Sequence, residues 1–177
     1  MDETELIVGS LGGDRTAARQ LYDRHAPRVF RLLFRVVGNE ELAREYTQDT
    51  FVRVFQRLGQ FRGDSAFSTW VYAVAMSSAL TGMRRVKRLR AREAELAEAE
   101  AVAAPAPERD PHLQERLQRE LGRLPERLRT TVVLHDVEGF THREIAEMLG
   151  IPQGTSKARL AEARTRLREA LAGVATE

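Results

Sequence analysis

Three prolines within seven residues, Pro105, Pro107 and Pro111, interrupt this 177-residue chain beyond its midpoint. Proline lacks an amide hydrogen and clashes with the preceding helical turn, so no helix can run through this stretch. The residues before it are rich in Ala and Glu, which favour helix. We therefore expect a linker over residues 93–112, whose first part can extend a helix, between a domain over 1–92 and a second over 113–177.

The composition on both sides of this linker predicts helices. Ala, Leu, Arg and Glu predominate, aromatic residues make up only 6%, and no stretch of useful length alternates as a strand does. We expect an all-α protein of two small helical domains joined by a flexible linker. A large aromatic-lined enzyme pocket is disfavoured by the same numbers.

Several kinds of chemistry are excluded or disfavoured. The chain has no cysteine, which excludes disulfides, zinc–thiolate sites, iron–sulfur clusters and thiol catalysis. Its four histidines are scattered, with no HExxH motif and no phosphate-binding loop, so we expect no enzyme activity, no metal and no cofactor. No apolar run approaches the roughly 20 residues of a membrane span, and the first residues are acidic, unlike a signal peptide. We expect a cytoplasmic protein.

The small net charge of +2 hides a pattern along the chain. Residues 1–90 carry +5, residues 91–115 carry −5 and residues 116–177 carry +2, and 26 of the 28 basic residues are Arg. Two basic segments therefore flank an acidic one. Nucleic acid is one partner for such segments, and ordinary solvated helix faces are the alternative.

The first domain is predicted to contain several amphipathic helices. Asp14 or Thr16 can cap a helix over about 17–22, a further helix covers about 29–37, and Gly38 suits its end. The next helix, over about 40–58, has an apolar stripe and, beside it, an acidic-polar face. A solvated face is the simpler interpretation and a docking surface the alternative. This face consists of Glu41, Glu45, Gln48, Asp49, Val52 and Gln56.

Turn-forming residues alternate with aromatic ones over residues 59–70, before a new helix that begins near Ser68 or Thr69. Phe67 and Trp70 are three residues apart, so we expect at least one to pack in the core, with base stacking as the alternative. Residues 84–92 then contain six basic residues and no acid, which is typical of phosphate contact.

Residues 139–160 have the pattern of a helix-turn-helix rather than that of a plain helical hairpin. Thr141 and Glu144 form a capping box, and Gly150 supplies the turn. The expected buried side of the first helix is Ile145, Ala146 and Leu149, with Ile151 between the helices; Thr155 or Ser156 can start the second, whose apolar side is Leu160, Ala163, Leu167, Ala170 and Leu171. For Glu162 on the opposite side, a pair with Arg159 or Arg166 and a contact to a cytosine amino group are equally good interpretations.

In these motifs the chain resembles a bacterial sigma factor of the extracytoplasmic-function (ECF) type, within the sigma-70 family. The resemblance spans nearly the whole chain and follows the family's order of motifs. It rests on Leu21-Tyr22, residues 45–51, residues 61–70, Leu124-Pro125 and residues 138–160.

The resemblance implies a non-catalytic specificity subunit of RNA polymerase. Its implied partners are the clamp coiled coil of the large polymerase subunit, the flap region, promoter DNA and an anti-sigma factor. The acidic-polar face defined above would bind the core polymerase. The implied minus-ten or single-strand DNA residues are Phe61, Arg62, Gly63, Asp64, Ser65, Phe67, Thr69, Trp70, Arg84, Arg85, Lys87 and Arg88. The implied minus-thirty-five residues are Thr141, Arg143, Thr155, Lys157, Ala158, Arg159, Ala161, Glu162 and Arg164.

Three parts of the sequence depart from the family pattern. The stretch 73–77 lacks the family's Arg and Ala-Arg-Asn run, Ser156 stands where Val is favoured and can cap the helix instead, and Glu162 stands where Arg is common. Two other functions stay open at this point. One is a helix-turn-helix regulator that binds duplex DNA without joining the polymerase, and the other is a helical enzyme or scaffold whose arginines are only solvated.

Overall fold

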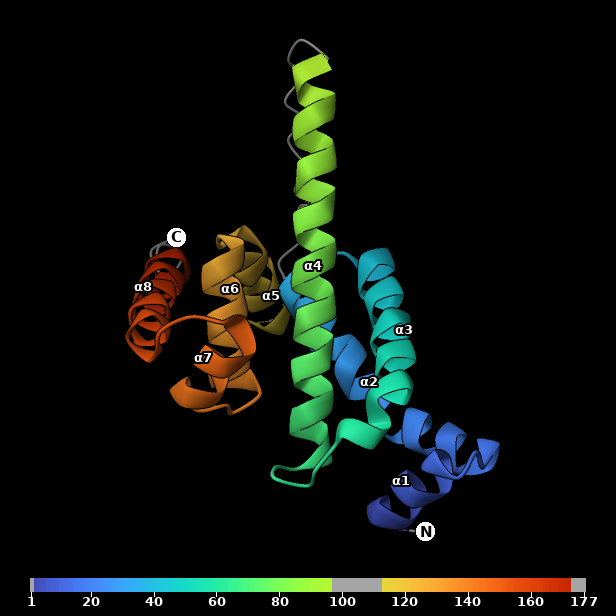
Figure 1. The fold of residues 1–177 in the computed structure, drawn as a ribbon. Helices are drawn as coiled ribbons and strands as arrows, with labels where there is room; N and C mark the ends of the chain where they lie inside the picture. Colours follow the sequence, from blue (N-terminus) through green and yellow to red (C-terminus); the bar gives the residue numbers. More distant parts are fainter. Residues whose placement is uncertain (1, 97–112, 173–177) are drawn as a thin grey trace.

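The computed structural model describes residues 2–96 and 113–172, and every regular element in these ranges is a helix (Figure 1). The predicted all-α fold class is confirmed. Most of the linker expected at 93–112 lies outside the described residues. The elements are α1 (Glu3–Leu11), α2 (Arg15–Val37), α3 (Glu40–Arg57), the 3-10 turn η1 (Leu58–Gln60), α4 (Phe67–Leu96), α5 (Leu113–Arg123), α6 (Glu126–Val132), the π-helical turn η2 (Val133–Val137), α7 (His142–Leu149) and α8 (Gln153–Ala172).

Helix α2 is one continuous helix, where the sequence predicted two. Asp14 caps it by accepting from the Thr16 amide (2.7 Å), and it ends at Gly38, which has a φ of 73°. Pro27 lies inside it, on the exposed side, and removes one backbone hydrogen bond. The helix continues because both halves bury the same face. That face contains Ala17, Leu21, His25, Ala26, Val29, Leu32, Leu33 and Val36.

Helix α1 was not predicted, although its N-terminus carries a local signal. Asp2 and Glu5 form a capping box, in which the Glu5 amide donates to Asp2 Oδ1 and the Asp2 amide donates to Glu5 Oε2, both at 2.8 Å. Leu6 is fully buried, and Glu3 lies 2.9 Å from the His25 ring. The helix is therefore attached to α2 by an apolar and a polar contact.

The long helix α4 stands between α1 and α3 on one side and α6–α8 on the other (Figure 1). It ends at Leu96, four residues beyond the domain boundary expected at 92. Its close approach to α3 depends on Gly82. A Cβ atom at this position would lie 2.6 Å from the hydroxyl oxygen of Tyr46, which is itself buried.

The Gly82→Ala variant is expected to be less stable than the unchanged protein by about 1–3 kcal/mol, the usual cost of overpacking a core. In an open helix the same change would stabilise by about 1 kcal/mol. Urea unfolding followed by circular dichroism measures the difference. The matched control is Gly154→Ala in α8, where a Cβ meets nothing within 4 Å, and a gain in stability for both variants would contradict the close contact with Tyr46.

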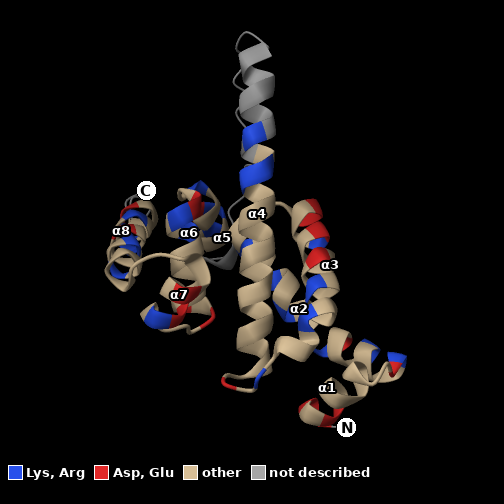
Figure 2. Cartoon of the chain, viewed as in Figure 1, with Lys and Arg blue, Asp and Glu red and all other residues tan. Residues whose placement is uncertain are grey.

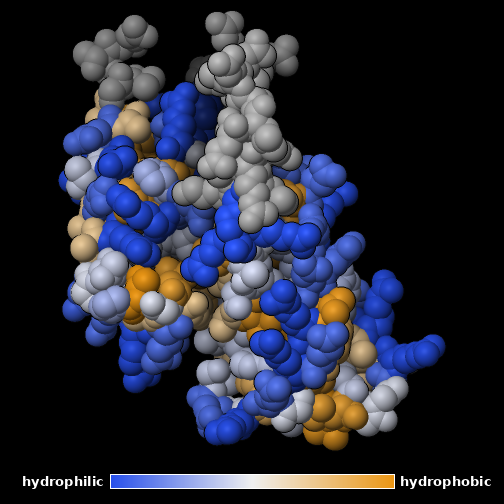
Figure 3. Space-filling view, turned by 45° about the horizontal axis from the view of Figure 1, so that its top comes forward, coloured by the Kyte–Doolittle hydropathy of each residue, from blue (hydrophilic) through white to orange (hydrophobic). Residues whose placement is uncertain are grey.

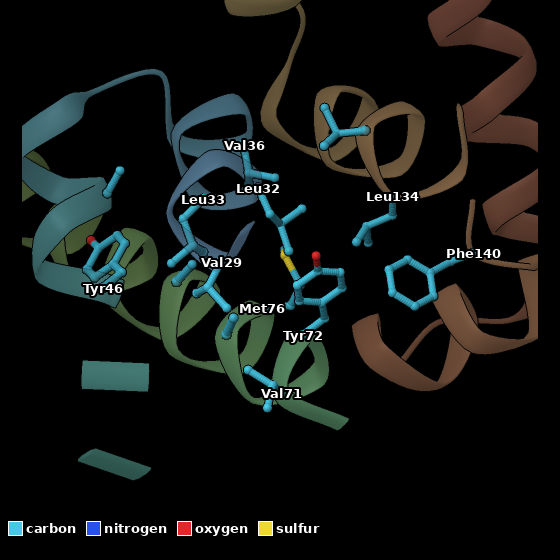
Figure 4. Close-up of a cluster of buried hydrophobic side chains, with 14 of the residues drawn as sticks. Val29, Leu32, Leu33, Val36, Tyr46, Val71, Tyr72, Met76, Leu134 and Phe140 are labelled. Atoms are coloured by element: carbon cyan, nitrogen blue, oxygen red, sulfur yellow. The ribbon is translucent and has the colours of Figure 1, made fainter. Parts of the chain in front are cut away.

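The two halves of the chain pack directly on each other. Figure 4 shows Leu134 and Phe140 from the second half beside Tyr72 of α4, and the Phe140 and Tyr72 rings meet edge to face at 5.7 Å. Arg35 of α2 donates to Glu138 across the same boundary at 3.2 Å. We call this packing of α5–α8 on α2 and α4 the closed arrangement. It means that the linker is not the only connection between the two domains.

The surface drawn in Figure 3 is largely hydrophilic, with a hydrophobic patch at the end of the molecule where α1 lies. None of the described helices is long and apolar enough to cross a membrane. In the same residues, no group of three or more His, Asp or Glu side chains is arranged to hold a metal ion. The described large apolar side chains that are exposed are Val8, Leu11, Val52, Leu117 and Val137.

Candidate functional site

The acidic-polar face of α3 is exposed to solvent. All six of its predicted residues are exposed, and Figure 2 marks several acidic residues along α3. Val52 lies among them with 57% of its surface exposed. An apolar side chain at the centre of a charged rim is typical of a protein docking surface.

Helix α3 holds this face rigidly because its opposite side is well anchored. Asn39 caps the helix by accepting from the Leu42 amide at 2.9 Å. The hydroxyls of Thr47 and Thr50 are buried and donate to carbonyls one turn earlier, at 2.7 and 2.6 Å. Tyr46 packs against Gly82 of α4 on the same side.

Three aromatic rings form a cluster where the loop 61–66 meets α4. Phe67 lies 5.2 Å from Phe61 and 5.7 Å from Trp70, measured between ring centroids, and Phe61 lies 5.6 Å from Trp70. Phe67 is only 2% exposed, whereas Phe61 and Trp70 are half-buried. The rings of Phe61 and Trp70 can therefore offer a stacking surface, and Phe67 supports it from the core.

His25 also belongs to this aromatic cluster. It was not among the site residues predicted from the sequence. Its ring meets Phe67 edge to face at 5.2 Å, and its Nε2 lies 2.9 Å from Glu3 Oε1. Burial lowers the pKa of His25, and the nearby Glu3 carboxylate partly offsets this. The pattern of the sequence carries no signal for this contact, because Glu3 and His25 come from different helices.

The other residues of the predicted minus-ten set are exposed. Residues 62–65 lie on the loop, where Gly63 has a φ of 79°, and Thr69 is half-buried at the start of α4. Arg84, Arg85 and Arg88 are exposed on α4, in the basic band that Figure 2 shows just below the grey residues. The side chain of Lys87 lies outside the described residues. The band begins about five helical turns, or about 26 Å, along α4 from the end of the loop.

The helix-turn-helix has the predicted connection between α7 and α8. Thr141 and Glu144 form the capping box, and Gly150 takes the left-handed turn with a φ of 63°. Hydrogen bonds from the Thr141 amide and hydroxyl lower the pKa of Glu144. Ile145 is fully buried, whereas Ala146, Leu149 and Ile151 of the expected apolar set are only half-buried.

Helix α8 differs from the sequence prediction in three places. It begins at Gln153, so Ser156 lies in its first turn rather than at its cap, where it is fully buried and lies 3.0 Å from His142 Nδ1. Ala170 is exposed and Leu171 is half-buried, because the helix extends beyond the elements that cover Leu160, Ala163 and Leu167. Because the Ser156 hydroxyl has His142 as a hydrogen-bond partner, Ser156 can be buried without leaving an unpaired polar group.

Two predicted minus-thirty-five side chains are paired within the protein. Arg164 donates to both oxygens of Asp136 at 2.9 and 2.6 Å, and these bonds lower the pKa of Asp136. Glu162 accepts from Arg166 at 2.9 Å, which matches the intrahelical alternative for that residue. Thr141 is occupied by its capping box. Lys157, Ala158, Ala161 and Arg143 are exposed, and Thr155 is half-buried.

In the closed arrangement, predicted DNA contacts from the two domains face each other. A cavity of about 190 Å³ between the domains is lined by Arg84 of α4 and by Arg159 of α8. A second cavity, of about 400 Å³, includes Thr69 and reaches Glu138 and Phe140 of the second domain. Both predicted surfaces are thus partly covered by their neighbour.

Family models match both halves of the chain. The model described as "Sigma-70 region 2" matches residues 21–89, and that described as "Sigma-70, region 4" matches residues 114–167. The ECF RNA polymerase sigma factor SigE of Mycolicibacterium smegmatis is 36% identical over 184 residues, which cover 99% of this chain and 71% of that protein. This chain is an ECF sigma factor of the sigma-70 family.

Solved structures share the fold of this ECF sigma factor. The sigma factor RpoE from Bartonella quintana, solved in complex with the anti-sigma factor NepR, superposes with a TM-score of 0.69 at 22% identity, over 86% of this chain and 95% of that one. CnrH, solved in complex with the cytosolic domain of CnrY, gives a TM-score of 0.64 at 25% identity, over 96% of both chains. The family models and the relative SigE confirm the family resemblance found in the sequence motifs, and the solved structures agree with the fold.

Proposed function

We propose that this ECF sigma factor binds core RNA polymerase and directs promoter recognition, DNA melting and transcription initiation. In this proposal the acidic-polar face of α3 binds the core polymerase. The loop 61–66 and the start of α4 separate the DNA strands, and α8 reads the duplex upstream element. The observation that carries the proposal is the match to both sigma-70 regions, each with an exposed face of the chemistry its role needs. The protein would act by binding, without catalysis, and would work in the cytoplasm.

The loop has the features that the melting role requires. Extracting a base from the duplex costs a few kcal/mol, which a stacking surface must offset. The half-buried rings of Phe61 and Trp70 can supply that surface, and stacking on an aromatic ring contributes about 1–3 kcal/mol per base. The exposed Arg84, Arg85 and Arg88 would hold the strand's phosphates.

The closed arrangement must open for both promoter elements to be bound. The minus-ten and minus-thirty-five elements lie about 25 base pairs apart, which is about 85 Å at 3.4 Å per base pair. Domains that share a side-chain boundary cannot span that distance. We therefore assign the closed arrangement to the protein before it engages the promoter. The sequence resemblance also predicts an anti-sigma factor as a partner.

Run-off transcription tests the proposed function. Core polymerase with the purified protein is expected to start from a promoter that core polymerase alone ignores. A helix-turn-helix regulator that acts without joining the polymerase would instead bind the duplex by itself and leave core polymerase inactive on this template. That second result would replace the proposed function with the alternative one.

The Lys157→Ala and Arg159→Ala variants are each expected to weaken binding of the holoenzyme to a duplex that carries the upstream element. Each lost phosphate contact should reduce the slope of log affinity against log salt by about 1. Fluorescence anisotropy across a salt series measures both quantities. Arg168→Ala is the matched control, eleven residues and about 16 Å further along α8 than Lys157. Equal losses in all three variants would contradict a local role for the start of the helix.

A further inference from the structure

A second cationic surface, absent from the predicted sites, lies on α2. Arg28, Arg31 and Arg35 are spaced so that they share one face of this helix, and we call them the arginine row. They line the 400 Å³ cavity between the domains, together with the side chains of Ser68 and Thr69 at the start of α4. Arg28 and Arg31 are exposed, and Arg35 is half-buried.

A carboxylate from the other domain already occupies this cavity. Glu138 accepts from Arg35 Nη1 at 3.2 Å, and only 14% of its side chain is exposed. Burial raises the pKa of Glu138, and the charges of all three arginines act in the opposite direction. Arg35 therefore already binds one carboxylate oxygen, supplied by a residue 103 positions further along the chain, and Arg28 and Arg31 act on the same carboxylate through their charge.

The dimensions and the position of the row suit a nucleic-acid strand. Guanidinium groups bind carboxylate and phosphate oxygens in the same way. Arg28 and Arg35 are seven residue steps apart, or about 10 Å along the helix, so the row is long enough to contact more than one phosphate of a strand. Its hydroxyl neighbours Ser68 and Thr69 directly precede Trp70, the ring proposed above to stack on an unpaired base.

We propose that the arginine row binds the phosphodiester backbone of the separated promoter strand, and that Glu138 fills this site until the two domains move apart. The proposal rests on the proposed function, because it extends the strand path from the melting loop onto α2. When the two domains separate and the strand binds, DNA phosphates take the place of the Glu138 carboxylate at the arginine row. In the closed protein Glu138 thus pairs with Arg35 and places a negative charge beside Arg28 and Arg31.

The first test uses the holoenzyme and a forked promoter fragment with an unpaired non-template strand. The double variant Arg28→Ala/Arg31→Ala is expected to bind this fragment at least about tenfold more weakly. Its salt slope should fall by about 1.4, at 0.7 for each lost contact with a single strand. The matched control is Arg15→Ala/Arg19→Ala, two exposed arginines at the start of the same helix.

Three results would overturn the proposal. One is unchanged affinity and slope for the double variant while the holoenzyme transcribes normally, which leaves the proposed function intact. Another is equal loss in the control variant. The third is weaker binding of the double variant to core polymerase itself, which would make the row a docking or structural element. An unchanged protein that fails to start transcription with core polymerase would instead remove the proposed function and this inference together.

The second test examines Glu138 in the protein without polymerase. Glu138→Gln removes the competing charge, so affinity for a single-stranded minus-ten oligonucleotide is expected to rise several-fold, whereas Glu169→Gln on α8 should leave it unchanged. The gain should disappear when Arg28→Ala/Arg31→Ala is added. Inorganic pyrophosphate and ATP are measured in parallel. Tighter binding of either compound than of the oligonucleotide, or no gain from Glu138→Gln, would overturn the assignment to a DNA strand held off by Glu138.

Discussion

The Asp49→Lys variant is expected to bind core RNA polymerase at least about tenfold more weakly than the unchanged protein, which corresponds to about 1.4 kcal/mol. Asp49 is exposed beside Val52 on the acidic-polar face of α3, so Asp49→Lys reverses a charge within the proposed docking surface and disturbs its electrostatic complementarity with the partner. Glu45→Lys is expected to act in the same direction. Affinity is measured by anisotropy with a labelled sigma factor, and run-off transcription at limiting protein should fall in parallel.

The matched control for this docking prediction is Glu40→Lys. Glu40 is an exposed acid of the same helix but points about 100° away from Glu41, outside the acidic-polar face. The control tests whether the position of the charge, rather than the net charge of the helix, decides binding. Unchanged affinity for both Asp49→Lys and Glu45→Lys would show that the polymerase docks elsewhere.

The Phe67→Ala variant is expected to lose about 3–5 kcal/mol of unfolding free energy, the usual cost of removing a buried phenylalanine. Phe67 is 2% exposed and contacts the rings of Phe61, Trp70 and His25. Truncation would leave a cavity beneath the loop 61–66 that neighbouring rings cannot fill without moving. Chemical denaturation measures the loss.

Trp70→Ala is the informative comparison for the aromatic cluster. Its ring is half-buried, so the variant should lose less stability than Phe67→Ala but more promoter opening, followed with a fluorescent base in the non-template strand. Promoter binding to a duplex upstream element should not change. If Trp70→Ala lost as much stability as Phe67→Ala and opened promoters normally, Trp70 would be a core residue only.

Features that depend on neighbouring residues were predicted from the sequence. The capping box of Thr141 and Glu144 and the turn at Gly150 involve backbone groups within a few residues, so residue type and spacing determine them. The exposed face of α3 followed in the same way from helical periodicity, which places Glu45 and Asp49 on one side.

Predictions failed where tertiary packing outweighed a local signal. The sequence predicted two helices, over about 17–22 and 29–37, yet burial of apolar residues on both sides of Pro27 keeps α2 continuous. Ser156 has the chemistry of a cap, yet its contact with His142 satisfies it inside the domain. In both cases burial of a shared face contributes more than one local hydrogen bond costs.

The sequence by itself determined the helical class, the helix-turn-helix, the family and the face of α3, because these follow from short-range periodicity and capping. Only the tertiary structure decided that the two domains close on each other, that Phe67 rather than Trp70 is the core ring, and that Glu138 reaches the arginine row. The physical reason is the range of the interactions. Burial and charge pairing between residues as far apart as Arg35 and Glu138 depend on how the helices pack, which no local pattern encodes.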